Sequence, residues 1–312
     1  MFMKQSATYP IENLDDGIEI TSVGDFIKRI KEMDELPINI GKNDMWVFRG
    51  QKTDFWRVEP SVFRDEFLGV EHDLLQQPLI QIPNEFLGIK DTFEIMTKYQ
   101  HYGMCTRLLD LTTNPLVALY FACEHYGNVK YSRDMKDDIE EREAYGVVYF
   151  KRAYPFLAID QNVKIISALA RMNLSQINKI DEILDELYTQ SVISEQDKTR
   201  WLSSAGYKNF VDIIKSNYIV KPAYSNDRLV RQSGMFLLAG CFAVKGDDEK
   251  TLVVEKERKD FKDFFDGFFY VDGESKDDFL QELDRCNINE STLFPELEHQ
   301  LSYIKNKISK LS

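Results

Sequence analysis

The stretch YQHYGMCTRLLDLTTNPLVALYFAC, residues 99–123, says more about fold and function than any other part of the chain. It places His, Thr, Arg, Asp and Asn in a short segment that leads directly into an almost uninterrupted apolar run. Polar side chains that are ordered against a buried element must find partners, because leaving them unpaired costs free energy. These residues therefore form either an internal hydrogen-bonded network or a site for a polar ligand.

Local signals around this stretch predict how it folds. Asn114 and Pro115 predict a helix start, since Asn is a favoured cap and Pro suits the first helical position. Residues 116–126 are apolar on nearly every side, which indicates a helix in the centre of the fold. We expect a second helix over 84–100 and a strand or extended turn over 106–111.

Two other segments combine apolar residues with polar ones in the same way. WVFRGQ, residues 46–51, predicts a buried strand over 45–49 that stops at a turn. At its end, the guanidinium of Arg49 suits a phosphate or a carboxylate, and Gly50 would let a ligand approach the backbone. The alternative is that Arg49 pairs with an internal acid. The other segment is RLVRQSGMF, residues 228–236.

The side chains in these segments suit acid–base or binding chemistry, and each also has a structural interpretation. His101 could act as a general base or a ligand donor near neutral pH, or could simply be a core residue. Arg107 and Asp110 could pair with each other. The amide of Gln232 offers a donor and an acceptor, which suits an amide or a ribose hydroxyl. Arg49, Arg107 and Arg231 could form a local basic pocket.

A metal site is an alternative interpretation of four residues in this region. His101, Cys105, Cys123 and His125 are close in sequence, and both residue types bind zinc. On a helix, however, residues 123 and 125 would point in different directions. We therefore expect no metal. Glycine-rich phosphate loops and the GxSxG and HExxH motifs are missing from the sequence.

Composition sets the broad class. The 312 residues are 43% hydrophobic, as in a globular protein, and carry a formal net charge of −13. That charge argues against broad electrostatic binding to nucleic acid, because neutralising phosphates requires clustered Lys and Arg. No apolar run approaches about 18 residues, so no membrane span is expected. The first residues lack the apolar core of a signal peptide, and the four cysteines form no CxxC pair, so we expect a cytoplasmic protein with reduced cysteines.

The remaining elements give an α+β pattern without regular βαβ alternation. We expect a mixed or antiparallel sheet of short strands with surrounding helices. Residues 160–218 are predicted to be a helical insertion or subdomain within a single domain over 1–312, and residues 130–143 a charged, exposed loop or linker. Other helices are expected to begin after Ser22 and at Pro60, and to cover 275–285 and 291–309; further strands are expected over 146–150, 234–244, 251–254 and 268–271.

Together these motifs resemble the FRG domain family, which is named for an aromatic-Arg-Gly motif. The middle motif is long and specific, and the resemblance spans most of the chain. The matching residues are Phe48-Arg49-Gly50-Gln51, Glu59-Pro60-Ser61, Arg64, Gln100-His101-Tyr102-Gly103, Thr106-Arg107-Leu108-Leu109-Asp110, Thr112, Asn114 to Ala122, Arg231-Gln232, Gly234, Phe236, Ile288-Asn289-Glu290 and Thr292 to Leu297.

The resemblance implies a bacterial or phage protein whose motif order is similar to that of ADP-ribosyltransferases. It implies an ADP-ribosyltransferase-like core that binds NAD or a related nucleotide and acts as a toxin or antiphage effector. The expected catalytic residues are His101, Thr106 and Gln232, and the expected cofactor-binding residues are Arg49, Gly50, Gln51, Arg107, Asp110 and Arg231. In this scheme Arg107 and Asp110 form a supporting ion pair.

The sequence departs from the transferase pattern in one place. Gln232 is not followed by a Glu two residues later, so the carboxylate that such chemistry needs is not evident. Glu94 or Asp110 could supply it only if the fold brings one of them to the site. The alternative function is a non-catalytic module that binds a nucleotide signal, or a protein partner through an acidic surface.

Overall fold

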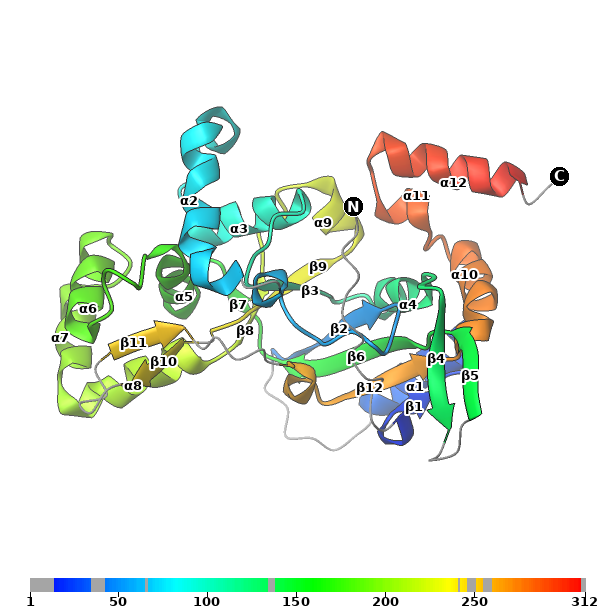
Figure 1. The fold of residues 1–312 in the computed structure, drawn as a ribbon. Helices are drawn as coiled ribbons and strands as arrows, with labels where there is room; N and C mark the ends of the chain where they lie inside the picture. Colours follow the sequence, from blue (N-terminus) through cyan, green and yellow to red (C-terminus); the bar gives the residue numbers. More distant parts are fainter. Residues whose placement is uncertain are drawn as a thin grey trace.

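The fold is built on a mixed β-sheet covered by helices (Figure 1). The computed structural model describes residues 14–34, 43–64, 67–133, 138–240, 242–245, 251–254 and 260–309. Within these residues, eight strands form the main sheet in the order β1-β12-β6-β2-β3-β9-β8-β7, and β4-β5 and β10-β11 form two small antiparallel sheets. The strands are β1 (Ile18–Glu19), β2 (Met45–Gln51), β3 (Leu108–Thr112), β4 (Asn128–Arg133), β5 (Asp138–Glu143), β6 (Gly146–Ala153), β7 (Phe156–Leu157), β8 (Tyr218–Lys221), β9 (Gly234–Leu238), β10 (Phe242–Lys245), β11 (Thr251–Val254) and β12 (Gly267–Val271).

The helices fall between these strands and after them. The α-helices are α1 (Val23–Asp34), α2 (Glu71–Gln81), α3 (Thr92–His101), α4 (Pro115–Cys123), α5 (Gln161–Arg171), α6 (Ile180–Thr189), α7 (Glu195–Leu202), α8 (Ser204–Lys215), α9 (Asp227–Arg231), α10 (Lys276–Arg285), α11 (Glu290–Leu293) and α12 (Leu297–Ser309). The short 3₁₀ helices are η1 (Leu14–Asp16), η2 (Ser61–Phe63), η3 (Phe67–Val70), η4 (Pro83–Phe86), η5 (Lys262–Phe264) and η6 (Gly273–Ser275).

One face of the sheet carries two separate helical layers. Around β6 and β12, helices α1, α4 and α10 pack on residues such as Val148 and Phe269. Around β8 and β9, helices α3, α5, α6 and α8 pack on residues such as Phe236 and Leu238. The alternate side chains of the strands, such as Val47 and Leu237, form a third core on the opposite face. The first face therefore has a seam between its two helical layers, and β2 and β3 lie at that seam.

Strands β2 and β3 barely pair. Their register has a single partner pair, Phe48 with Thr112, whereas β2 pairs with β6 along its whole length. Beyond that pair the backbone groups of the two strands lack the usual ladder. The main sheet is therefore split next to Arg49, and polar side chains from both strands can reach the opening.

Several local predictions are confirmed. Asn114 caps α4 by accepting a hydrogen bond from the backbone N of Leu116 at 3.0 Å, and Ser22 caps α1 by accepting one from Asp25 N at 3.0 Å. Strands form where we expected them at 146–150, 251–254 and 268–271, and α10 covers the predicted helix at 275–285. The predicted strand over 45–49 also forms, but it continues through Gly50 to Gln51. The α+β class is confirmed, since the sheet is mixed and the helices are interspersed.

Other predictions are wrong in an informative way. Residues 130–143, expected to be a charged loop, lie in the β4–β5 hairpin apart from its undescribed tip. The helix expected over 84–100 starts only at Thr92, because Gly88 adopts φ 86° and Asp91 caps the helix. Pro60 precedes only the short η2.

Two longer predicted elements are each divided in the structure. The helix expected over 291–309 is split into α11 and α12 on either side of Pro295. The strand expected over 234–244 is divided between β9 and β10, which belong to different sheets, and Cys241 lies outside the described residues.

Candidate functional site

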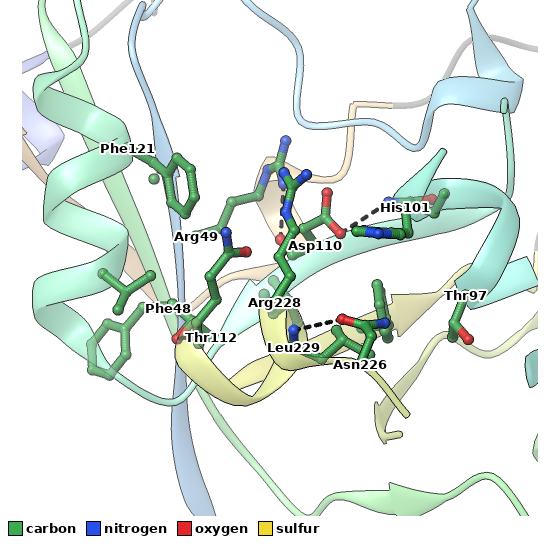
Figure 2. A pocket seen from close by; sticks show the side chains of 16 residues that line it. Phe48, Arg49, Thr97, His101, Asp110, Thr112, Phe121, Asn226, Arg228 and Leu229 are labelled. Carbon is green, nitrogen blue, oxygen red and sulfur yellow. Dashed lines mark hydrogen bonds between the residues drawn. The ribbon is translucent and has the colours of Figure 1, made fainter. Parts of the chain in front are cut away.

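A cavity of about 240 Å³ opens at the seam between the two helical layers; we call it the central pocket. Its lining comes from β2, β3, α3, α4 and the α9 region, so it collects side chains from all three polar segments of the sequence (Figure 2). The lining residues are Phe48, Arg49, Gly50, Thr97, Gln100, His101, Asp110, Leu111, Thr112, Val117, Phe121, Asn226, Arg228, Leu229, Gln232 and Phe236.

Arg49 spans the split in the sheet. Its Nη1 donates to the backbone carbonyl of Asp110 at 2.8 Å, and its Nε donates to Gln51 Oε1 at 3.1 Å. The side chain thus satisfies a carbonyl of β3 where the ladder has ended. Burial lowers the pKa of Arg49 to about 10, and the negative charge of Asp110 partly offsets this effect. The guanidinium therefore keeps its positive charge at neutral pH, half-buried at the pocket.

Gln51 accepts a hydrogen bond from the side chain of Arg49 and is itself buried. Its Oε1 accepts from Arg49, and its Nε2 donates to the backbone carbonyl of Trp56 at 3.2 Å. Gln51 does not line the pocket, so its contribution to a ligand site would be to orient the guanidinium.

The carboxylate of Asp110 lies at the pocket and is held by a short relay. Gln100 Nε2 donates to Asp110 Oδ1 at 3.1 Å, and Gln100 Oε1 accepts from the hydroxyl of Thr106. Thr106 is fully buried and does not line the cavity. It therefore acts on the site only through Gln100. Among the described residues, Asp110 supplies the only carboxylate in the pocket lining.

The α9 region lines another side of the central pocket. Thr112 Oγ1 donates to the carbonyl of Gln232 at 2.6 Å, and the carbonyl of Ser233 accepts from Thr113 N at 3.1 Å. Ser233 has φ 48°, a left-handed conformation that a non-glycine residue rarely adopts. These contacts fix α9 at the end of β3, so that Gln232 and Arg228 both line the pocket.

The chain segment from α11 to α12 lies beside this rim. Gln232 Nε2 donates to the carbonyl of Leu293 at 3.3 Å, and Arg228 stacks over the ring of Phe294 at 4.8 Å. His101 lines the pocket, and its Nε2 lies 3.9 Å from Glu296 Oε1. The opening of the pocket is therefore bordered by residues that are remote in sequence from the strands.

Besides Gln51 and Thr106, two more residues expected in the site lie outside the pocket lining. Arg107 is fully buried and forms its ion pair with Glu71 rather than with Asp110, so the predicted Arg107–Asp110 pair is wrong. Its Nη1 also donates to the carbonyls of Ala239 and Gly240 at 2.9 and 2.7 Å. Arg231 is exposed, and its guanidinium reaches toward α11 outside the pocket lining.

Gly50 lines the pocket, and the packing of a helix by itself already requires a glycine at this position. A Cβ built at Gly50 would lie 1.9 Å from the carbonyl oxygen of Ala118 in α4. Gly146 on the adjacent strand meets Ala122 in the same way, at 2.2 Å. The glycine is therefore required by the close packing of α4 on the sheet, whether or not a ligand approaches.

Sequence reasoning overlooked several lining residues, among them Arg228, Asn226 and Phe121. A signal for Arg228 was present, because Asn226 is a good helix cap and its side chain accepts from Leu229 N at 2.9 Å. On a helix that starts there, Arg228 and Gln232 lie four residues apart and are neighbours on the helix surface.

Within the part of the chain that the structure describes, no three His, Cys, Asp or Glu side chains are grouped as a metal site would require. In the same residues, no helix is both long and apolar enough to cross a bilayer.

Comparison with known proteins agrees with the motifs that build this pocket. Residues 44–130 match the family model of the FRG domain. The chain contains an FRG domain. The matched range runs from just before β2 to β4 and supplies Arg49, His101 and Asp110, while the α9 side of the pocket lies outside it. No curated protein and no solved structure matches the chain.

Proposed function

We propose that the central pocket of this FRG domain protein binds NAD or a related nucleotide and that the protein cleaves or transfers its ADP-ribose group. The observation that carries the proposal is that two guanidinium groups, Arg49 and Arg228, and one carboxylate, Asp110, line the same cavity (Figure 2). Arginine forks suit the oxygens of a diphosphate. A carboxylate near the ribose would stabilise the positive charge that develops as the glycosidic bond breaks.

The pocket also offers contacts for the rest of such a ligand. The amides of Gln232 and Asn226 can bond to ribose hydroxyls or to a carboxamide, and Phe121 presents an aromatic ring. At about 240 Å³ the cavity lies below the usual range of about 300–1,000 Å³ for ligand pockets. It would therefore enclose the reacting half of a dinucleotide, with the other half outside.

In the hydrolytic form of this reaction, the bond between ribose C1′ and the nicotinamide nitrogen breaks, and its electron pair leaves with nicotinamide. Water adds to C1′ and releases a proton, for which His101 in the pocket lining is the candidate acceptor. In the transferase form, a nucleophile on an acceptor takes the place of water. Consumption of NAD in this way would account for the toxin or antiphage role that the resemblance implies.

The test is to incubate the purified protein with NAD and to measure both nicotinamide release and the NAD-dependent rise in melting temperature. We expect Asp110→Asn to lower release at least about 100-fold, since it removes a charge aimed at the developing cation. Binding should survive in that variant, because Asn keeps the acceptor for Gln100. Arg49→Ala and Arg228→Ala should both weaken binding at least about 10-fold through loss of charge-assisted bonds.

Arg231→Ala is the matched control, because it removes an arginine from the same helix as Arg228 but from outside the pocket lining. Arg228→Ala provides an independent test of binding. It is needed because Arg49 bridges two strands, so that Arg49→Ala could lose binding by unfolding the sheet. A wild-type protein that neither releases nicotinamide nor is stabilised by NAD would contradict the proposal. Stabilisation without release would favour the non-catalytic binding module.

A further inference from the structure

Helix α12 contacts the rest of the molecule through its polar side. His299 Nδ1 lies 3.0 Å from Glu290 Oε1, and Ser302 Oγ donates to Glu290 Oε2 at 3.2 Å. Tyr303 donates its hydroxyl to Asp284 Oδ1 at 2.7 Å. None of the residues of α12 is buried, and Figure 1 shows the helix at the edge of the molecule, away from the sheet.

The apolar side chains of the same helix face water. Leu297, Leu301, Ile304 and Ile308 are 71%, 57%, 51% and 62% exposed. A surface helix normally buries its apolar stripe and leaves its polar face in solvent. In α12 this arrangement is inverted, and a contiguous exposed apolar stripe is a mark of an interaction surface.

The spacing of the stripe identifies the kind of surface. The four residues are separated by four, three and four positions, which is the d-a-d-a spacing of a coiled coil. In that register His299, Ser302 and Tyr303 take positions f, b and c, on the side of the helix opposite the a and d positions. Gln300, at position g, also donates to the carbonyls of Ser291 and Phe294. The contacts made from positions f, b and c agree with the register, and the outward face has the residue pattern of a helix-pairing surface.

We propose that α12 pairs with α12 of a second copy of this chain, in antiparallel orientation. Glu298 and Lys305 both occupy e positions and are both exposed. In an antiparallel pair e faces e, so Glu298 of each copy meets Lys305 of the other. In a parallel pair e faces g, and Lys305 would meet Gln300 instead, so no opposite charges would meet. The surface is thus self-complementary about a two-fold axis, as a symmetric dimer requires.

The helix-pairing surface is short. Thirteen residues make a helix of about 20 Å, and four apolar residues per copy line it. A contact of this size is expected to form reversibly and to depend on protein concentration, since specific interfaces that persist at low concentration usually bury more surface. Leu297 follows Glu296, whose carboxylate lies 3.9 Å from His101 Nε2, so the apolar stripe of α12 begins next to the central pocket.

Sedimentation or light scattering over a wide concentration range tests the proposal. The wild-type mass should rise from 36.5 kDa toward twice that value as the concentration increases. The double variant Leu301→Glu/Ile304→Glu should stay monomeric and folded, because both side chains are already more than half exposed. Ile80→Glu is the matched control: this exposed isoleucine lies on α2, and its replacement should leave the association unchanged.

Charge reversal tests the orientation. Glu298→Lys and Lys305→Glu should each weaken association at low salt, because like charges then meet at both e positions. A mixture of the two variants should associate preferentially as a heterodimer, since every facing pair becomes opposite again. The double variant Glu298→Lys/Lys305→Glu should recover wild-type association. A monomeric wild type at every concentration would overturn the proposal, as would wild-type association of the Leu301→Glu/Ile304→Glu variant or of the two single charge-reversal variants.

Discussion

At the scale of single residues, Gly50 is the position where the constraint of packing is clearest. The Gly50→Ala variant must move α4, because the new Cβ would lie 1.9 Å from Ala118 O, a backbone atom that cannot rotate away. We expect a loss of at least about 2 kcal/mol of unfolding free energy, as for an overpacked core. Urea denaturation would measure it. Gly69→Ala is the matched control, since a Cβ at Gly69 meets nothing within 4 Å. Equal stability of the two variants would show that α4 yields without cost.

Residue types and short motifs could predict that Arg49, His101, Asp110 and Gln232 belong near one another, and the structure places all four around the central pocket. The partner of Arg107 could not be predicted. Asp110 is three positions away in sequence, but Glu71 is the acid that the fold brings to the guanidinium. Pairing inside a core is decided by tertiary packing, and the nearest opposite charge in sequence is a poor guide to it.

At the scale of elements, a hydrogen bond to the buried carboxylate of Asp54 links the β4–β5 hairpin to the rest of the fold. Tyr131 donates its hydroxyl to Asp54 Oδ1 at 2.7 Å, while Asp54 Oδ2 is buried without a partner. Burial raises the pKa of Asp54 from 3.8 to about 6, although the nearby positive charge of Lys276 opposes the shift. Lys276 in turn contacts Glu143 at 3.4 Å.

This raised pKa predicts how stability depends on pH. Between about pH 4 and pH 6 the folded state holds a proton on Asp54 that the unfolded chain has lost, so stability falls as the pH rises through this window. Asp54→Asn should flatten that part of the profile and add about 1–3 kcal/mol near neutral pH. Urea unfolding near pH 5 and pH 7.5 would show it. An unchanged slope in the variant would mean that other carboxyls cause the dependence.

The hairpin also shows where hydrophobic periodicity fails as a predictor. Its register places Lys130 opposite Glu141 and Val129 opposite Arg142, so cross-strand pairing takes the place of an apolar face. A strand in a two-stranded, largely exposed sheet has little need for alternating apolar residues, and its charged composition resembles that of a loop. Strands β2, β6, β9 and β12 of the main sheet contribute to buried cores, and their apolar runs predict them, whereas the sequence analysis does not predict β1, β7 or β8.

At the scale of the whole molecule, the central pocket depends on segments that sequence spacing cannot relate to one another. Arg49 and Arg228 are separated by most of the chain, and they meet because β2 and α9 both border the end of β3. Sequence motifs indicate Arg49, His101, Asp110 and Gln232 as candidates, whereas the strand order and the split between β2 and β3 determine where these side chains converge. Because of the same split, Arg49 also has a structural role: it bonds to the carbonyl of Asp110 in β3, in addition to its expected contact with a ligand.

The buried Arg107–Glu71 pair joins distant parts of the fold, because Arg107 also binds the carbonyls of residues 239 and 240 and stacks on Phe242 of β10 at 4.4 Å. Glu71→Gln should therefore be costly, by about 3–5 kcal/mol, since it leaves a buried guanidinium without its counter-charge. Arg107→Met should cost a similar amount by stranding the carboxylate. The loss of unfolding free energy in the double variant should be smaller than the sum of the two single losses, because neither charge then remains buried alone. A double-mutant cycle from urea unfolding measures this coupling, and strictly additive losses would show that the two charges do not depend on each other for their stability in the core.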